Sequence, residues 1–183
     1  MIRFIKLIVK FFVRNNALFF TELFFKDFWS LRESYIKKPS RLKKKLYLFV
    51  CEHYDCWIGL GAEFANKPTF PHGLHGIFIS NRARIGADCV IFHQVTIGSN
   101  SLPDSKNNGS PTIGNNVYIG CGAKIIGNVT VSDNCRIGAN CIITKNIEPN
   151  TTCIIDNIKQ IHKQEKMNNE FIAVHAINND SRK

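Results

Sequence analysis

"PTIGNNVYIGCGAKIIGNVTVSDNCRIGANCIIT", residues 111–144, repeats one pattern every six residues. A β-branched aliphatic residue occupies each sixth position, and a small or β-branched residue follows it four positions later. Residues 79–98 carry the same pattern, so ten anchor positions share it, and nine of them are isoleucine. The anchors are Ile79, Ile85, Ile91, Ile97, Ile113, Ile119, Ile125, Val131, Ile137 and Ile143. A repeat this regular decides the fold before any other feature does.

A period of six is neither that of a helix nor the alternation of a simple strand. It suits a triangular coil of three short, flat strands, in which the anchor fills the interior and a glycine or other small residue helps to turn the corner. Three repeats then complete one turn, and each coil buries its anchors against its neighbours. We therefore predict a mainly β solenoid. Cys89, Cys135 and Cys141, each four after an anchor, are expected to be buried small hydrophobes.

Two stretches carry a resemblance to a known family. "PHGLHGIFISNRARIGADCVIFHQVTIG", residues 71–98, and the stretch 111–144 resemble the hexapeptide-repeat acyltransferases. Within them they look like serine acetyltransferases and the relatives that acetylate capsule or lipopolysaccharide sugars. The match covers about residues 57–150. It implies a left-handed parallel β-helix, an exception to the usual right-handed crossover, and a homotrimer with active sites between subunits.

Composition and charge divide the chain into three parts. A length of 183 residues with 44% hydrophobic content suits one domain with a short accessory segment. We predict a basic, mainly helical segment over residues 1–56, the β-helix over 57–156, and a short helix with a polar tail over 157–183. Residues 1–50 hold twelve Lys/Arg against three Asp/Glu, so they carry +9 of the net charge of +10. The rest of the chain is close to neutral, whereas a nucleic-acid binder would spread basic and aromatic residues over its folded face, so the charge argues against nucleic-acid binding.

The stretch "MIRFIKLIVKFFVRNNALFF", residues 1–20, is read as an amphipathic basic helix. Charged residues interrupt its apolar run, which is too short to cross a membrane, and no small-residue cleavage site follows. Such a helix packs on the rest of the protein or lies on an anionic membrane surface. With no export signal, the seven cysteines are expected to be free thiols in the cytoplasm, with the inner face of the membrane as a further location. Their spacing matches no zinc site, so no metal is expected.

A break in the repeat predicts a loop. The step from Ile97 to Ile113 is one repeat plus ten extra residues, which lie in "SNSLPDSKNNGSP", residues 99–111. This composition is typical of a loop, and a loop on a rigid scaffold often serves a site, although a tolerated surface insertion is the alternative. The resemblance implies that it reaches toward the neighbouring subunit and borders the acceptor pocket, with Asp104 as a candidate acceptor-binding residue.

Counting from coil to coil places His75, His93, Cys121 and Ala139 in one outward column. Its lower end carries imidazoles and its upper end small residues, along which a long, thin ligand could contact the backbone closely. The resemblance identifies this ligand as acetyl-CoA, the acyl donor. It places Gly120, Cys121, Gly138 and Ala139 along the pantetheine arm. Arg136 is placed near the adenosine phosphate, with a solvated surface charge as the alternative.

Acyl transfer from a thioester to a hydroxyl needs a base and donors for the developing oxyanion. A histidine is the usual base near neutral pH, and "HGLHG", residues 72–76, places two imidazoles in a glycine-rich turn. The resemblance assigns the base to His72, with His75 in reserve and His93 in the acceptor pocket. Serine acetyltransferases have an orienting Asp where Trp57 stands here, so Asp55, or else Glu63, is expected to orient the base.

Other departures from the family bear on the acceptor. Ser110 replaces a second family histidine, and the N-terminal segment is shorter than the helical domain of serine acetyltransferases. These differences favour a hydroxyl of a sugar or surface polysaccharide precursor, and L-serine, the acceptor in cysteine biosynthesis, is the alternative. A hypothesis of another class is a noncatalytic β-helix that serves as a scaffold or binding module.

Overall fold

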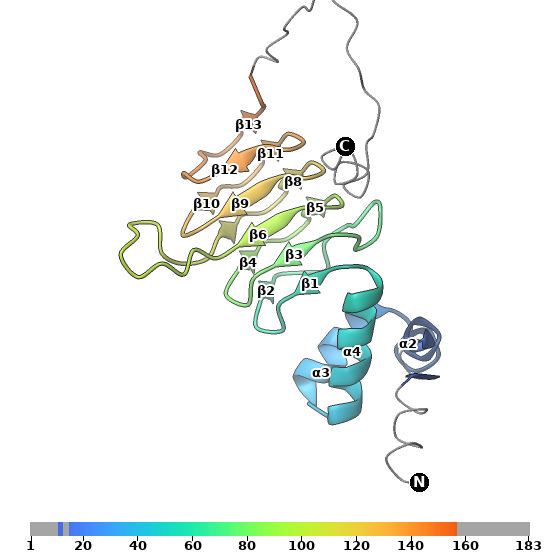
Figure 1. Ribbon diagram of the computed structural model, residues 1–183. Helices are drawn as coiled ribbons and strands as arrows, with labels where there is room; N and C mark the ends of the chain where they lie inside the picture. Colours follow the sequence, from blue (N-terminus) through green and yellow to red (C-terminus); the bar gives the residue numbers. More distant parts are fainter. Residues whose placement is uncertain (1–10, 13–14, 157–183) are drawn as a thin grey trace, which may run out of the picture.

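The computed structural model describes residues 11–12 and 15–156 (Figure 1). The helices α2 (Ala17–Phe25), α3 (Phe28–Lys37) and α4 (Arg41–His53) lie at one end, and short strands stack away from them. These helices confirm the predicted helical character of the N-terminal segment. Most of the predicted amphipathic helix over residues 1–20 is outside the described residues, as are the predicted short helix and tail over 157–183. Within the described residues, no helix is long and apolar enough to cross a membrane.

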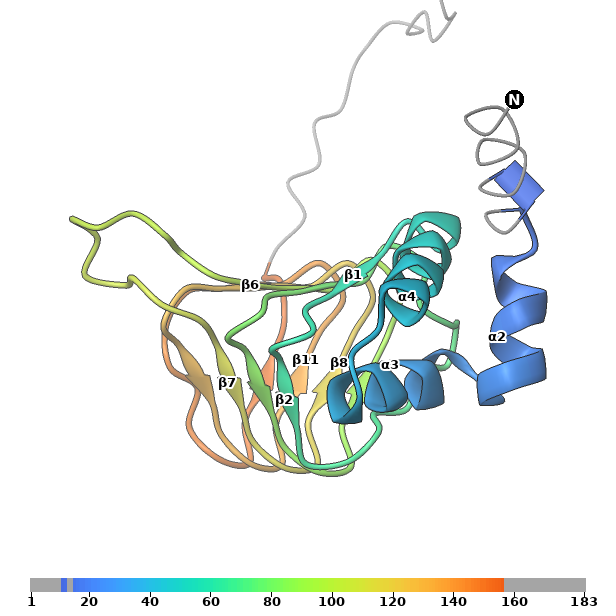
Figure 2. The same cartoon turned by 90° about the horizontal axis from the view of Figure 1, so that it is seen from below.

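The strands form three parallel sheets around a triangular interior (Figure 2). The first sheet contains β1 (Trp57–Ile58), β3 (Phe78–Ile79), β6 (Thr96–Gly98), β9 (Lys124–Ile126) and β12 (Ile142–Ile143). The second contains β2 (Glu63–Phe64), β4 (Arg84–Ile85), β7 (Thr112–Ile113) and β10 (Thr130–Val131). The third contains β5 (Val90–Ile91), β8 (Tyr118–Ile119), β11 (Arg136–Ile137) and β13 (Thr152–Cys153). Successive strands along the chain enter different sheets, which makes the chain a parallel β-helix.

The strand register confirms the six-residue repeat and the stacking of its anchors. In the third sheet Ile119 pairs with Ile91 on one side and Ile137 on the other, and all three side chains are fully buried. The residues four after the anchors are buried as well, because their relative exposures are between 0% and 4%. They are Ala83, Cys89, Val95, Val117, Ala123, Val129, Cys135 and Cys141. Both sets therefore form one continuous aliphatic core along the stack.

The glycines that follow the anchors have a different role from the one predicted. None of them has a positive φ, so they do not turn the corner by a left-handed conformation. Instead the next coil lies too close for a side chain, because a Cβ on Gly120 would lie 2.8 Å from the Ala139 nitrogen and one on Gly138 would lie 2.9 Å from the Cys153 oxygen. Six residues that lie three after an anchor have a left-handed conformation instead, with φ between 53° and 70°. They are Asp88, Gln94, Asn116, Gly122, Asn134 and Asn140.

The helices close the lower end of the β-helix with two buried polar side chains. Tyr47 is fully buried and donates its hydroxyl hydrogen bond to the Ile58 carbonyl. Arg32, 4% exposed, donates from Nη2 to the carbonyls of Gly59 at 3.2 Å and Ala62 at 2.5 Å. These carbonyls belong to the first coil, where no lower coil can pair with them. Since a terminal repeat must be capped, the helices serve as that cap.

An ion pair also ties α3 to the first coil. Asp27 caps the N-terminus of α3 by accepting a 2.7 Å hydrogen bond from the Ser30 amide. Its other carboxylate oxygen lies 2.7 Å from Nζ of Lys67. Burial alone would raise the pKa of Asp27, but Lys67 and Ser30 outweigh it and lower that pKa to about 2. The carboxylate therefore stays ionised and paired far into the acidic range.

The predicted loop leaves the β-helix between β6 and β7 and is closed at its base. Asn100 and Gly109 exchange two backbone hydrogen bonds of 2.8 and 2.9 Å, and the hydroxyls of Ser99 and Ser110 lie 2.7 Å apart. Figure 2 shows the loop projecting from the corner between the first and second sheets, away from the helices. The strand before the loop stays in register with the next coil, since Gly98 pairs with Ile126.

Candidate functional site

The corner between the third and first sheets contains the predicted column of outward residues. We call it the histidine corner; it consists of residues 70–77, 92–95, 120–123 and 138–141. At this corner an equivalent backbone hydrogen bond joins each coil to the next, with the carbonyls of His75, His93 and Cys121 as acceptors. The donors are the amides of Gln94 at 2.9 Å, Gly122 at 3.0 Å and Asn140 at 2.8 Å. His75, His93, Cys121 and Ala139 therefore occupy equivalent positions in successive coils, as the count along the sequence predicts.

Two imidazoles meet at this corner. Nδ1 of His72 lies 2.8 Å from Nδ1 of His93, within hydrogen-bond distance, and the ring centroids are 4.9 Å apart. His72 is exposed, whereas His93 is half-buried. The side chains come from different segments, because His72 lies in the turn before β3 and His93 in the turn between β5 and β6. The structure thus brings together two of the predicted site residues and leaves one imidazole open to solvent.

Phe92 supports His72 from a second side, a contact that sequence reasoning did not find. The His72 ring meets the Phe92 ring edge to face, with centroids 5.2 Å apart, and Phe92 in turn contacts Tyr118 at 5.1 Å. Its place immediately before His93, at the end of a strand, was the available signal. The open imidazole is therefore held between an aromatic ring and a hydrogen-bond partner.

His75 and the predicted orienting carboxylates lie elsewhere. The His75 ring packs edge to face on Tyr54, with 4.9 Å between the ring centroids, instead of on His72 or His93. Asp55 is exposed, with a φ of 47°, and among the described residues its carboxylate accepts no hydrogen bond from a histidine. Glu63 pairs at 3.2 Å with Arg84 on the second sheet. Neither carboxylate orients His72 in this structure.

The upper half of the histidine corner carries small side chains. Gly120 is buried, Cys121 and Gly138 are half-buried, and Ala139 is exposed. The close approach of the next coil already requires glycine at positions 120 and 138. Their small size therefore has a structural cause as well as the predicted role in binding the donor. Lys124 adds a cation beside the column, because its Nζ donates a 2.6 Å hydrogen bond to the Gln94 carbonyl. Sequence reasoning did not identify this lysine.

Two further candidates are remote from the histidines within one chain. Arg136 lies on the outer face of the third sheet, paired in register with Tyr118 and Thr152, and is exposed. Asp104 is exposed in the loop, which leaves a different corner of the triangle. Arg136 is on the strand that leads into the upper column, whereas Asp104 does not meet His72 or His93 in the same chain.

A cleft lies below the histidine corner, between the helices and the first coil. Its walls include Phe28, Trp29, Tyr54, Phe70, Gly73 and Leu74. The Asp27–Lys67 ion pair also lines it, and Gly73 directly follows His72 in the chain. The cleft therefore has largely apolar walls and a charged pair on its lining, and it adjoins the turn that contains His72.

The residues that could hold a metal are not gathered at one place. In the described ranges, no group of three or more His, Cys, Asp or Glu side chains converges. All seven cysteines are free. Burial raises the pKa of the Cys89 thiol, so this cysteine behaves as the small core residue that the repeat predicts.

Comparisons with known proteins agree with this architecture. Residues 110–145 match the family model "Bacterial transferase hexapeptide (six repeats)". A serine acetyltransferase of Staphylococcus xylosus is 37% identical over 70 residues, which cover 38% of this chain and 31% of the relative. One of Synechococcus elongatus is 36% identical over 69 residues, covering 38% and 27% of the two chains. The structure of serine acetyltransferase isoform 3 from Entamoeba histolytica, in complex with cysteine, superposes with a TM-score of 0.62 at 31% identity.

The E. histolytica match covers 75% of this chain and 48% of that one, so the chain spans less than half the length of each of these relatives. The superposition confirms the predicted left-handed β-helix. Residues 110–145 thus match a hexapeptide-repeat family model, and the β-helix as a whole is similar to that of serine acetyltransferases.

Proposed function

We propose that this protein is an acetyl-CoA-dependent O-acetyltransferase with His72 as its general base. The observation that carries the proposal is an exposed imidazole, held by His93, at the foot of a column of small residues. Serine acetyltransferase relatives of the same β-helix support it. His75 stays the reserve candidate for the base, whereas no hydrogen bond among residues 15–156 supports Asp55 as the orienting carboxylate.

The open nitrogen of His72 defines the chemistry. Nε2 would take the proton of the acceptor hydroxyl as its oxygen bonds to the acetyl carbonyl carbon. The same proton would then pass to the sulfur as the carbon–sulfur bond breaks, which leaves an O-acetyl ester and the free thiol. Backbone N–H groups or the Lys124 ammonium, close to the corner, are candidates to stabilise the oxyanion.

For the acceptor, we propose a hydroxyl of a sugar or surface polysaccharide precursor. The cleft beside Gly73 supports this choice, because largely apolar aromatic walls suit the faces of a sugar ring better than a small zwitterion. Ser110 in place of a family histidine points the same way. L-serine, as in cysteine biosynthesis, is the second candidate. Asp104 would contact the acceptor only from the loop of a neighbouring chain.

Acetyl transfer to a panel of hydroxyl acceptors tests the function. The full-length protein is incubated with acetyl-CoA and with L-serine or with sugars and nucleotide sugars, and release of the free thiol is followed. We expect turnover with a sugar. Turnover with L-serine alone would reject the sugar acceptor and keep the enzyme class. No turnover together with no acetyl-CoA binding would favour a noncatalytic scaffold.

The donor column gives a separate prediction. If Cys121 and Ala139 line the pantetheine arm, Ala139→Trp places a large side chain across the exposed column and should abolish measurable acetyl-CoA binding. The corresponding change on the opposite face, Thr112→Trp in the second sheet, should leave binding unchanged. Calorimetric titration measures the acetyl-CoA affinity of both variants. If the two affinities were equal, the column would not be the donor site, and the roles proposed for Gly120, Gly138 and Arg136 would be rejected with it.

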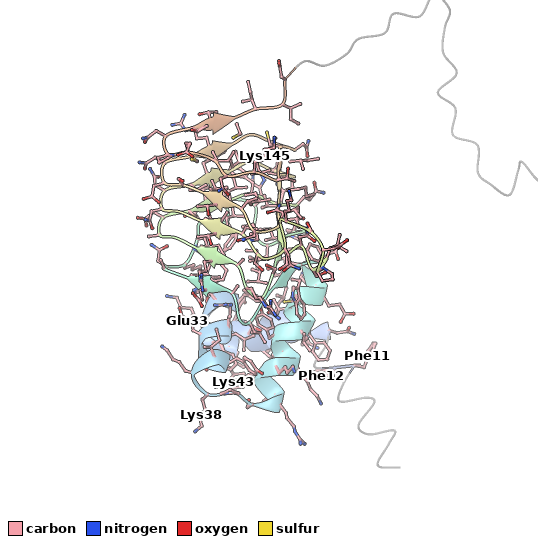
Figure 3. All side chains as sticks on the ribbon, turned by 90° about the vertical axis from the view of Figure 1, so that its left-hand side faces the viewer. Phe11, Phe12, Glu33, Lys38, Lys43 and Lys145 are labelled. Carbon is pink, nitrogen blue, oxygen red and sulfur yellow. The ribbon has the colours of Figure 1, made fainter. Side chains whose placement is uncertain are left out.

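We also propose a homotrimer in the cytoplasm whose helices can contact an anionic membrane surface. In one chain the loop and the histidines lie at different corners, so a three-fold arrangement would bring the loop of one chain to the histidines of the next. The helical end carries apolar side chains that are 58% to 67% exposed, and it also carries basic side chains, including Lys38 and Lys43 (Figure 3). These apolar side chains are Phe11, Phe12, Phe19, Leu23, Phe24 and Leu42.

Sedimentation checks both parts. The purified chain should sediment as a trimer, and an active monomer would contradict the shared site. Added vesicles containing phosphatidylglycerol should carry the protein with them, whereas vesicles of phosphatidylcholine alone should not. Equal behaviour with both vesicles would reject the membrane contact.

A further inference from the structure

We infer that His93 is a positioning residue for His72, not an acceptor-binding residue. Its imidazole holds His72 in the one tautomer that leaves Nε2 free to accept a proton. The catalytic meaning of this inference rests on the proposed function. The hydrogen bond between the two Nδ1 atoms, which are 2.8 Å apart, is part of the structure whatever the protein's activity is.

The contact between the two Nδ1 atoms restricts where the protons lie. A neutral imidazole carries one N–H, so one ring must donate from Nδ1 and the other must accept there. When His72 donates, its Nε2 bears a lone pair, which is what a base requires. When His72 accepts, its Nε2 carries the proton and cannot take another. After His72 gains a proton at Nε2, its Nδ1–H still points at the lone pair of His93, so the cation keeps its partner.

The two histidines differ in how firmly the fold holds them. The turn with His93 lies between two paired strands, its carbonyl accepts a 3.0 Å hydrogen bond from Gly122, and its side chain is half-buried. His72 lies in a longer turn next to Gly73, whose φ is 67°, and its side chain is exposed. The fixed imidazole therefore positions the exposed one, and Phe92 of the same coil supplies the second contact.

No carboxylate competes for this role in the described part of the chain. His93 is the one side chain there that hydrogen-bonds to His72. The charged group next to this turn is Lys124, whose ammonium is engaged by the Gln94 carbonyl. A second imidazole thus takes the role for which the sequence predicted Asp55.

Two substitutions of similar size separate positioning from mere packing. His93→Gln keeps an oxygen that can accept the His72 Nδ1–H, whereas His93→Met fills the space without a comparable acceptor. We expect His93→Met to lower kcat by about 10²-fold, the lower end of what a general base contributes, with KM for the acceptor unchanged. His93→Gln should restore most of that rate.

Nitrogen NMR of the histidines in the full-length protein, at a pH where imidazoles are neutral, gives a readout that needs no turnover. His72 should be the Nδ1–H tautomer in the wild type and in His93→Gln, and a mixture of tautomers in His93→Met. The inference is overturned if the tautomer of His72 does not change in His93→Met. It is also overturned if His93→Met raises KM for the acceptor and leaves kcat unchanged. If the tautomer changes as expected but no acceptor is ever acetylated, the positioning role stands and the proposed function fails.

Discussion

Replacing His72 with alanine should lower the rate of acetyl transfer by about 10² to 10⁴-fold, the usual contribution of a general base. Acetyl-CoA affinity should stay nearly the same, because the proposed donor contacts lie higher in the corner, near Cys121 and Ala139. Steady-state turnover and calorimetric titration of the same preparation measure the two quantities.

His75→Ala is the matched control, since His75 is an exposed imidazole three residues away whose ring packs on Tyr54. Its loss should change the rate far less. If His75→Ala were inactive and His72→Ala fully active, the base would be the other imidazole of "HGLHG". If both variants kept full rate, neither histidine would take part in catalysis.

Ile119→Asp should destabilise the protein by several kcal/mol, because it places an unpaired charge in a fully apolar interior. Ile119 is fully buried and stacked between Ile91 and Ile137, so water cannot reach the new carboxylate without separating the coils. Chemical denaturation followed by circular dichroism measures the change.

The neighbouring Tyr118 provides the control for this substitution. It lies on the same strand, β8, but points outward and is 43% exposed. Tyr118→Asp should therefore have a much smaller effect on the free energy of unfolding. Equal losses of stability for the two variants would contradict the inward and outward assignment of this strand.

The core could be predicted from the sequence because its cause is local and repeated. Each anchor, such as Ile119 between Ile91 and Ile137, faces the interior for the same steric reason as those above and below it. The column from His75 to Ala139 followed from the same count, since equal coil lengths place equivalent residues above one another. Handedness needed the resemblance, because the spacing is the same for either hand.

The pairing inside the histidine corner could not be predicted in this way. His72 lies in a turn outside the regular period, where Gly73 and Gly76 have φ values of 67° and 65°. The path of such a turn decides which imidazole meets His93, and no spacing rule describes it. Asp55 was expected near the base on the strength of its position in the sequence, but the end of α4 leaves it exposed at a left-handed residue.

The error about the glycines has a different cause. A hexapeptide pattern shows that a small residue is needed after the anchor, but not whether the corner or the next coil requires it. The structure assigns the left-handed corner to residues such as Asn116 and Asn134, whose short polar side chains tolerate that conformation. Gly120 and Gly138 are needed because the backbone of the next coil is close.

The closed base of the loop has a consequence for how this scaffold can diversify. Asn100 and Gly109 are hydrogen-bonded to each other on either side of residues 101–108. The length of that segment therefore does not change how the coils stack. Insertions and deletions there need not be multiples of six, unlike changes anywhere in the stacked repeats. The segment can therefore be exchanged for one of another length or composition while the coils and the histidine corner keep their geometry.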